Sequence, residues 1–147
     1  MSNTKSIWHS VFSVEELRQR LGHTMAEHLG IRITEIGEDF LKGTMPVSEQ
    51  TRQPLGLVHG GANVTLAESL GSVGANMVVD REKYFCVGQE INANHVRSVS
   101  KGLVTGIAKP EYIGKASQVW SIKLYDDDNN LTCISRLTMA VLKRNRG

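Results

Sequence analysis

The chain has 147 residues, of which 40% are hydrophobic and 22% charged, and its formal net charge is +2. These values are typical of a globular domain that is large enough to bury one core. No apolar run approaches the roughly 18 residues of a membrane span, and the opening MSNTKSIWHSVF lacks the apolar stretch of a secretory signal. Cys86 and Cys133 stand far apart, which argues against a zinc motif or disulfide framework and predicts a reducing, cytoplasmic setting.

The small net charge hides a difference between two parts of the chain. Residues 1–96 contain 8 Lys and Arg against 11 Asp and Glu, whereas residues 97–147 contain 9 against 4. A basic second part suits an anionic ligand, and a solvated edge explains it equally well, so both interpretations stay open. The basic residues alternate with apolar ones and form no aromatic-lined basic motif, which disfavours nucleic acid as a partner.

The first expected element is a helical segment over residues 14–28, within a single domain that spans residues 1–147. Ser13 and Glu16 have the spacing of a capping box, which marks a helix start. Gly22 divides the segment into two short helices. His23 and His28 are five residues apart, a poor spacing for metal ligands on a helix, so no metal is expected there.

The remaining elements predict an α+β domain. In chain order they are two strands within 31–47 joined by a turn at 37–39, a loop over 48–56, a helix over 57–76, and strands within 85–99, 103–113, 117–125 and 131–143. We expect the last four strands to pair in meander order, in an antiparallel sheet that curls around the long central helix.

The central helix separates into two faces on a helical wheel. The apolar face, expected against the sheet, consists of Ala62, Leu66, Leu70, Val73 and Met77, and the opposite face of Gly61, Thr65, Glu68 and Ser72. Such a polar stripe is usually a solvent face. Here the neighbours of Glu68 are small, unlike the Lys, Glu and Gln of a solvated helix. A covered carboxylate is costly unless it is partnered or used, so Glu68 is a candidate functional group.

Four glycines interrupt this helix, at positions 60, 61, 71 and 74. Each costs about 1 kcal/mol relative to alanine, and the close approach of another backbone or of a ligand accounts for that cost. Gly60 and Gly61 expose backbone N–H groups at the positive end of the helix, where they can stabilise an oxygen that gains negative charge.

Gly61 and Glu68 cannot act together within one chain. They are seven residues apart, which is about 10 Å along a helix axis, so one carbonyl cannot reach both. If both serve one reaction, two antiparallel helices related by a twofold axis must share two identical sites. The working unit would then be a dimer.

The segments QPLGLVHGGANVTLAESLGSVGAN and VGQEINANHVRS resemble the hotdog-fold acyl-CoA thioesterases, in the branch that carries a glutamate on the central helix. The resemblance runs from about Leu29 to Leu142. It implies a hotdog fold, hydrolysis of an acyl-CoA to free acid and CoA, no cofactor, and a homodimer that pairs further into a homotetramer. The members that it resembles most act on aryl thioesters, such as 1,4-dihydroxy-2-naphthoyl-CoA in menaquinone synthesis or hydroxybenzoyl thioesters. The alternative that the resemblance leaves open is a proofreading thioesterase that acts on aryl thioesters bound to a carrier protein.

The resemblance also implies roles for individual residues. Glu68 would be the general base or nucleophile, and the N–H groups of Gly60 and Gly61 would polarise the thioester carbonyl. Gln53 would hold the same oxygen, His59 would orient the carbonyl or the leaving group, and Ser72 would position Glu68 or water. His95 would line the acyl pocket. Further substrate contacts would come from Arg97, Ser98, Lys101, Lys109 and Lys115.

Several of these residues have a structural alternative. His59 can simply cap the helix, His95 can be a satisfied strand histidine, and Lys101 and Lys115 beside turn glycines can serve solubility. Two other functions also fit the fold. One is a hotdog dehydratase or hydratase, whose His lies in a different motif, and the other is a non-catalytic acyl-CoA-binding module. An esterase GxSxG motif and a Walker motif are both absent.

Overall fold

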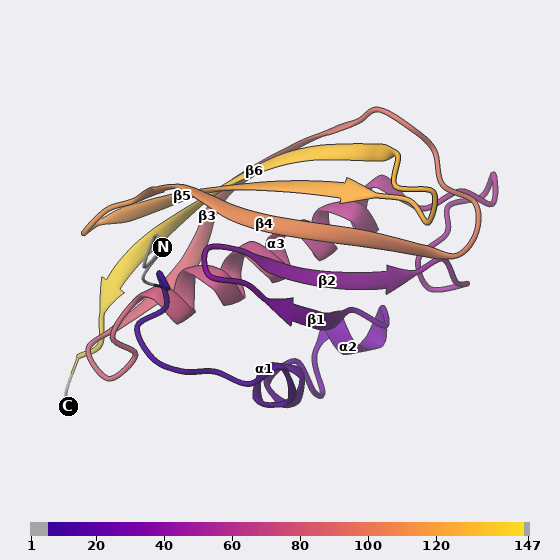
Figure 1. The fold of residues 1–147 in the computed structure, drawn as a ribbon. Helices are drawn as coiled ribbons and strands as arrows, with labels where there is room; N and C mark the ends of the chain where they lie inside the picture. Colours follow the sequence, from indigo (N-terminus) through magenta and orange to yellow (C-terminus); the bar gives the residue numbers. More distant parts are fainter. Residues whose placement is uncertain (1–5, 146–147) are drawn as a thin grey trace, which may run out of the picture.

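The computed structural model describes residues 6–145, and Figure 1 shows a long helix lying under a curved sheet. The elements are α1 (Val14–Arg20), α2 (Met25–His28), β1 (Arg32–Ile36), β2 (Leu41–Pro46), α3 (Gly60–Val78), β3 (Tyr84–His95), β4 (Leu103–Ile113), β5 (Ser117–Tyr125) and β6 (Leu131–Lys143). The expected α+β fold, with a sheet wrapped around a central helix and short N-terminal helices, is therefore confirmed.

The sheet has the order β1-β2-β4-β5-β6-β3, and every neighbouring pair is antiparallel. The prediction of a four-strand meander was wrong, because β3 pairs with β6 and not with β4. Tight turns join β4 to β5 and β5 to β6, with Gly114 N–H donating to Ser117 O and Asp126 N–H to Asn130 O. The longer connection over 96–102 runs from β3 to β4, and β4 pairs with β2. As a result, β3 lies at an edge of the sheet.

The core lies between α3 and the concave face of the sheet. Ala62, Leu66, Leu70 and Met77 are buried there as expected, whereas Val73 is only half-buried. Val73 lines a pocket together with Leu17 and Leu21, so it faces the N-terminal helices. The curved sheet covers more of the helix than one apolar stripe, and Asn63, Ala67, Gly71, Gly74 and Ala75 are buried as well.

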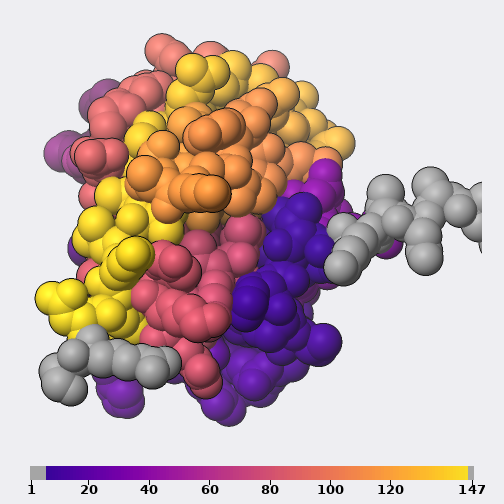
Figure 2. Space-filling view, turned by 90° about the vertical axis from the view of Figure 1, so that its left-hand side faces the viewer, coloured from indigo at the N-terminus to yellow at the C-terminus, as the bar shows by residue number. Residues whose placement is uncertain are grey.

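The N-terminal segment packs against the edge of this core. The capping box is present, since Ser13 Oγ accepts from Glu16 N–H at 3.1 Å and Glu16 Oε2 accepts from Ser13 N–H at 2.8 Å. Trp8 stacks on Trp120 with ring centroids 6.3 Å apart, and Trp120 is fully buried. Figure 2 shows the chain around the end of α3 reaching the surface between this segment and the C-terminal strand.

Within residues 6–145, no helix is both long and apolar enough to cross a membrane. The predicted domain limits at residues 1 and 147 lie outside the described residues and stay predictions.

Candidate active site

The start of α3 is built by the sequence His-Gly-Gly. His59 is the N-cap residue, and its Nδ1 accepts from Gly61 N–H at 2.8 Å. His59 therefore caps the helix, which is the structural alternative given above to a functional role. His59 thereby accepts from the N–H of Gly61, one of the two backbone donors that the sequence predicts to be free. The N–H of Gly60 donates to no protein group between residues 6 and 145, so Gly60 carries the open donor.

Two stretches of the chain that are distant in sequence meet in one pocket of about 270 Å³ at this end of α3. Five of the predicted site residues line it, namely Gln53, Gly60, His95, Arg97 and Ser98. They come from the loop before α3, from the first residue of α3, and from the end of β3 with the connection that follows. The pocket therefore joins the two sequence segments on which the resemblance rests.

His95 ends β3, where it pairs with Cys133 of β6. Its ring lies so close to the start of α3 that a Cβ added at Gly60 would be 2.8 Å from His95 Nε2. Glycine at position 60 thus makes room for the imidazole. His95 Nδ1 lies 3.4 Å from the side-chain nitrogen of Asn63.

The loop that carries Gln53 is tied to the start of the helix. Gln53 N–H donates to Leu57 O at 2.8 Å, and Gly56, with a φ of 80°, turns the chain and donates to Gln53 O at 2.9 Å. Buried Thr51 accepts from His59 N–H at 2.7 Å through its carbonyl and donates to Pro46 O at 2.8 Å through its hydroxyl. The side-chain oxygen of Gln53 accepts from Leu55 N–H, and Gln53 lines the pocket.

Glu68 and Ser72 lie farther along α3 and do not line this pocket. Glu68 is half-buried, and its carboxylate lies against Gly88 of β3, where there is no room for a Cβ. A bulge between Gly88 and Glu90 bends the strand at that point. Ser72 lines a second pocket with Leu17 and Val73. One chain by itself therefore keeps Glu68 apart from the start of the helix.

Sequence reasoning missed two residues of this region, Asn63 and Gly88. Asn63 is 5% exposed and lines the pocket beside His95. A polar residue in line with Ala67 and Leu70 on the helix was the signal that could have identified it. For Gly88 the signal was a glycine inside a strand, which often marks a bulge or a close approach.

The predicted lysines are not gathered at the pocket. Lys101, Lys109 and Lys115 are exposed and do not line it. Lys109 follows Ala108, which is buried under α3, so its side chain points to the opposite face of the sheet, where Nζ lies 3.2 Å from Asp39 Oδ2. These lysines stay predicted contacts, which the geometry of one chain does not bring together.

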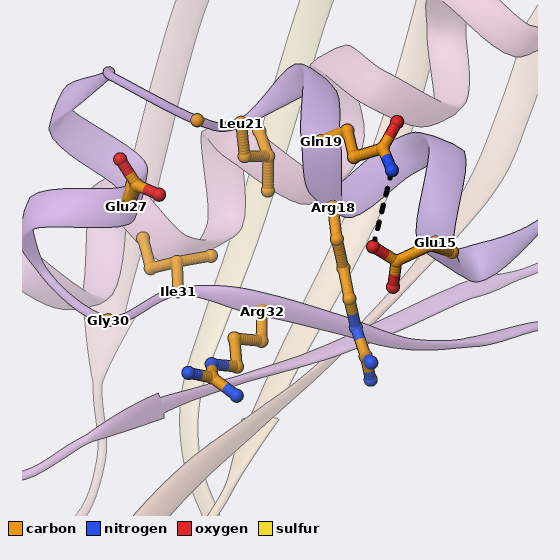
Figure 3. Close-up of a pocket in the computed structure, with 9 residues that line it drawn as sticks. Glu15, Arg18, Gln19, Leu21, Glu27, Gly30, Ile31 and Arg32 are labelled. Atoms are coloured by element: carbon orange, nitrogen blue, oxygen red, sulfur yellow. Dashed lines mark hydrogen bonds between the residues drawn. The ribbon is translucent and has the colours of Figure 1, made fainter.

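Another pocket, of about 410 Å³, lies between α1, α2 and β1 (Figure 3). Arg18 crosses it to donate from Nε to Ile33 O on β1 at 2.8 Å, and Gln19 Nε2 donates to Glu15 Oε1 at 3.4 Å. None of the predicted site residues lines it, so we do not assign the reaction to this pocket.

The two thiols do not suit a nucleophilic role. Burial raises the pKa of Cys86 to about 11 and also raises the pKa of Cys133, so both remain protonated near neutral pH. No group of three or more His, Cys, Asp or Glu within the described part of the chain is arranged to hold a metal ion. The candidate groups are therefore the carboxylate, imidazole, amide and backbone N–H groups named above.

Comparison with known proteins identifies the family. Residues 55–133 match the thioesterase superfamily, and this stretch includes the start of α3, Glu68 and β3. The chain belongs to the thioesterase superfamily. It is 47% identical to the 1,4-dihydroxy-2-naphthoyl-CoA hydrolase of Escherichia coli, over 92% of this chain and 99% of that one. It is 46% identical to the proofreading thioesterase EntH of Cronobacter sakazakii, over 92% and 98% of the two chains.

A crystal structure of a mutant thioesterase from Pseudomonas aeruginosa has the same fold. Its TM-score is 0.93 at 42% identity, over 95% of this chain and 100% of that one. These relatives confirm the hotdog fold expected from the sequence and establish that the protein is a thioester hydrolase.

Proposed function

We propose that this thioester hydrolase acts on acyl-CoA, with aryl-CoA such as 1,4-dihydroxy-2-naphthoyl-CoA or a hydroxybenzoyl thioester as its preferred substrate class. The single observation that carries the proposal is the convergence of Gln53, Gly60 and His95 in one pocket at the positive end of α3. The name of the 47% identical relative supports an aryl-CoA substrate.

The proposed reaction needs only groups that the chain supplies. The carbonyl oxygen of the thioester accepts from Gly60 N–H and from the Gln53 amide, so negative charge that develops on it is stabilised by preorganised donors and the helix dipole. Glu68 either removes a proton from attacking water or attacks the carbonyl carbon itself to form an anhydride that water then opens. The C–S bond breaks, and the CoA thiolate leaves without the help of a catalytic triad.

The proposed site is shared between two subunits. Within one chain Glu68 lies outside the pocket that holds Gly60, so a second copy must bring its glutamate to that pocket. Strand β3, which flanks Glu68, is an edge of the sheet and offers unpaired N–H and C=O groups to a second copy. A twofold dimer would create two equivalent sites, and a pair of such dimers would form the proposed homotetramer.

Basic groups near the pocket would bind the anionic part of CoA. Arg97 and Ser98 line the pocket, and Lys101 lies in the same connection after β3. Lys109 and Lys115 would contribute only if the partner subunit or the substrate reaches their faces. We expect salt to weaken CoA-ester binding, because phosphate contacts are screened.

The proposal is tested by release of free thiol from a panel of thioesters. The panel holds an aryl-CoA related to dihydroxynaphthoyl-CoA, 4-hydroxybenzoyl-CoA, a dihydroxybenzoyl carrier-protein thioester and medium-chain acyl-CoAs. A preference for aryl-CoA that vanishes in Glu68→Ala supports the proposal. A preference for the carrier-protein thioester would favour a proofreading function, as in the name of the 46% identical relative. CoA-ester binding without thiol release from any substrate would contradict the proposal.

The shared site is tested by mixing two inactive variants. Glu68→Ala subunits and Gln53→Ala subunits each lack one half of the proposed site, and a heterodimer of the two has one site with both halves intact. We expect activity to recover to about half of the wild-type value per dimer. Verified heterodimers that stay inactive would show that the two residues serve the same half of the site.

A further inference from the structure

Asn63 combines deep burial with an unpaired polar atom. It is 5% exposed at the fourth position of α3, and its Oδ1 is one of two buried side-chain polar atoms without a hydrogen-bond partner among residues 6–145. An unpaired buried group of this kind lowers the stability of the folded protein. Packing alone does not explain it, because an apolar side chain of the same size would avoid that cost.

The side chain of Asn63 faces the imidazole of His95. Asn63 Nδ2 and His95 Nδ1 are 3.4 Å apart, which is within hydrogen-bonding reach. The other ring nitrogen, Nε2, is turned toward Gly60 and lines the same pocket. Asn63 Nδ2 can only donate, so a hydrogen bond between these two atoms needs an unprotonated Nδ1, and a neutral ring then carries its proton on Nε2.

We propose that Asn63 is a positioning residue that holds neutral His95 with its proton on Nε2, so that the ring presents an N–H donor beside the N–H of Gly60. This inference rests on the proposed thioester hydrolysis at this pocket. Two convergent donors suit an oxygen that becomes an oxyanion, and a lone imidazole would divide its proton between its two nitrogens. The unpaired Oδ1 follows from this arrangement, because turning the amide to pair Oδ1 would require a proton on Nδ1.

The tautomer of His95 can be read without any substrate. The full-length protein, labelled with nitrogen-15 in histidine, is observed by imidazole NMR at about pH 8.5, where a free imidazole is neutral. In the wild type we expect His95 to have a protonated Nε2 and an unprotonated Nδ1. Asn63→Asp should reverse this state, because a carboxylate can only accept a hydrogen bond and draws the proton to Nδ1. Asn63→Leu should leave a mixture of the two tautomers.

Kinetics and stability then distinguish positioning from a structural role. We expect kcat for thioester hydrolysis to fall on the order of 100-fold in Asn63→Asp and at least 10-fold in Asn63→Leu. Asn63→Leu should keep or raise Tm, since it removes the unpaired buried oxygen. A purely structural Asn63 would give the opposite pattern, a lower Tm with unchanged kcat.

Asn94→Asp is a matched control. It introduces the same charge one residue before His95, on the opposite side of the strand, and should leave the tautomer as in the wild type. A wild-type His95 with its proton on Nδ1, or a wild-type tautomer that persists in Asn63→Leu, would overturn the inference. If the wild type releases no thiol from any thioester while the NMR results hold, the proposed function fails and the Asn63–His95 arrangement stands.

Discussion

Glycines in the two halves of α3 make room for side chains in two different environments. At the start of the helix, Gly60 leaves room for the imidazole of His95 beside an open N–H donor. In the second half, Gly71 and Gly74 are buried, and an added Cβ would lie 2.6 Å from Leu137 and 2.8 Å from Trp120. The first half of the helix makes room for a histidine of the proposed site, and the second half makes room for side chains of the core.

This difference corrects one sequence expectation. The sequence predicts that a backbone or a ligand comes close to all four glycines, yet at Gly71 and Gly74 the close neighbours are side chains of the sheet. A glycine shows that something comes close, and only the tertiary structure shows what that is. We therefore expect substitutions in the first half to change kcat and substitutions in the second half to change Tm.

The largest expected effect is on activity, at Glu68. In Glu68→Gln we expect kcat to fall roughly 10²–10⁴-fold, because the amide can act neither as a general base nor as a nucleophile. The two side chains have nearly the same shape, so Tm and the oligomeric state should stay unchanged. Steady-state thiol release and thermal unfolding measured on the same preparation check both expectations. Unaltered turnover would remove Glu68 from the mechanism.

Gly60→Ala should damage activity while leaving the fold intact. The new methyl group would push the His95 ring away, and a displaced donor costs on the order of 100-fold in kcat. The ring is exposed and can move, so we expect Tm to stay close to that of the wild type. An active Gly60→Ala enzyme would show that the close contact between Gly60 and His95 has no part in catalysis.

Gly74→Ala, the same substitution in the same helix, should give the reverse pattern. Its Cβ would meet the ring of Trp120, which cannot easily move, because it stacks on Trp8 and donates from Nε1 to Gln118 Oε1 at 2.8 Å. Overpacking of this kind costs about 1–3 kcal/mol. We expect a Tm lower by several degrees and a kcat that is unchanged per folded enzyme. A loss of kcat at full stability would contradict the division between the two halves.

The smallest expected effect concerns alkaline pH at the core end of α3. Burial raises the pKa of Cys86 from 9.0 to about 11. The thiol is protonated in both states below the unfolded pKa, so its contribution to stability is fully present there. Between the two values the unfolded chain releases the proton first, and the free energy of unfolding falls as pH rises.

This contribution can be isolated with Cys86→Ala. Thermal unfolding across the same pH range should show a steeper fall of Tm in the wild type than in the variant. The two profiles would run parallel if the thiol titrated alike in the folded and unfolded states.

The sequence alone determined the local structure and the family. The strands over 103–113, 117–125 and 131–143 have the predicted limits, because alternating residues and turn signals act over a few neighbours. The capping box at Ser13 is local in the same way. The motif around Glu68 was specific enough to indicate a thioesterase, and the comparisons confirm that family.

The tertiary structure decided which distant segments meet. The pairing of β3 with β6 and the meeting of Asn63 with His95 both depend on the path of the whole chain. No local pattern encodes that path, because a backbone group or a buried side-chain amide forms hydrogen bonds with whichever partner the packed sheet brings close to it. For this reason the sequence could indicate Glu68 as a candidate, and only the fold could show that Asn63 lies beside His95.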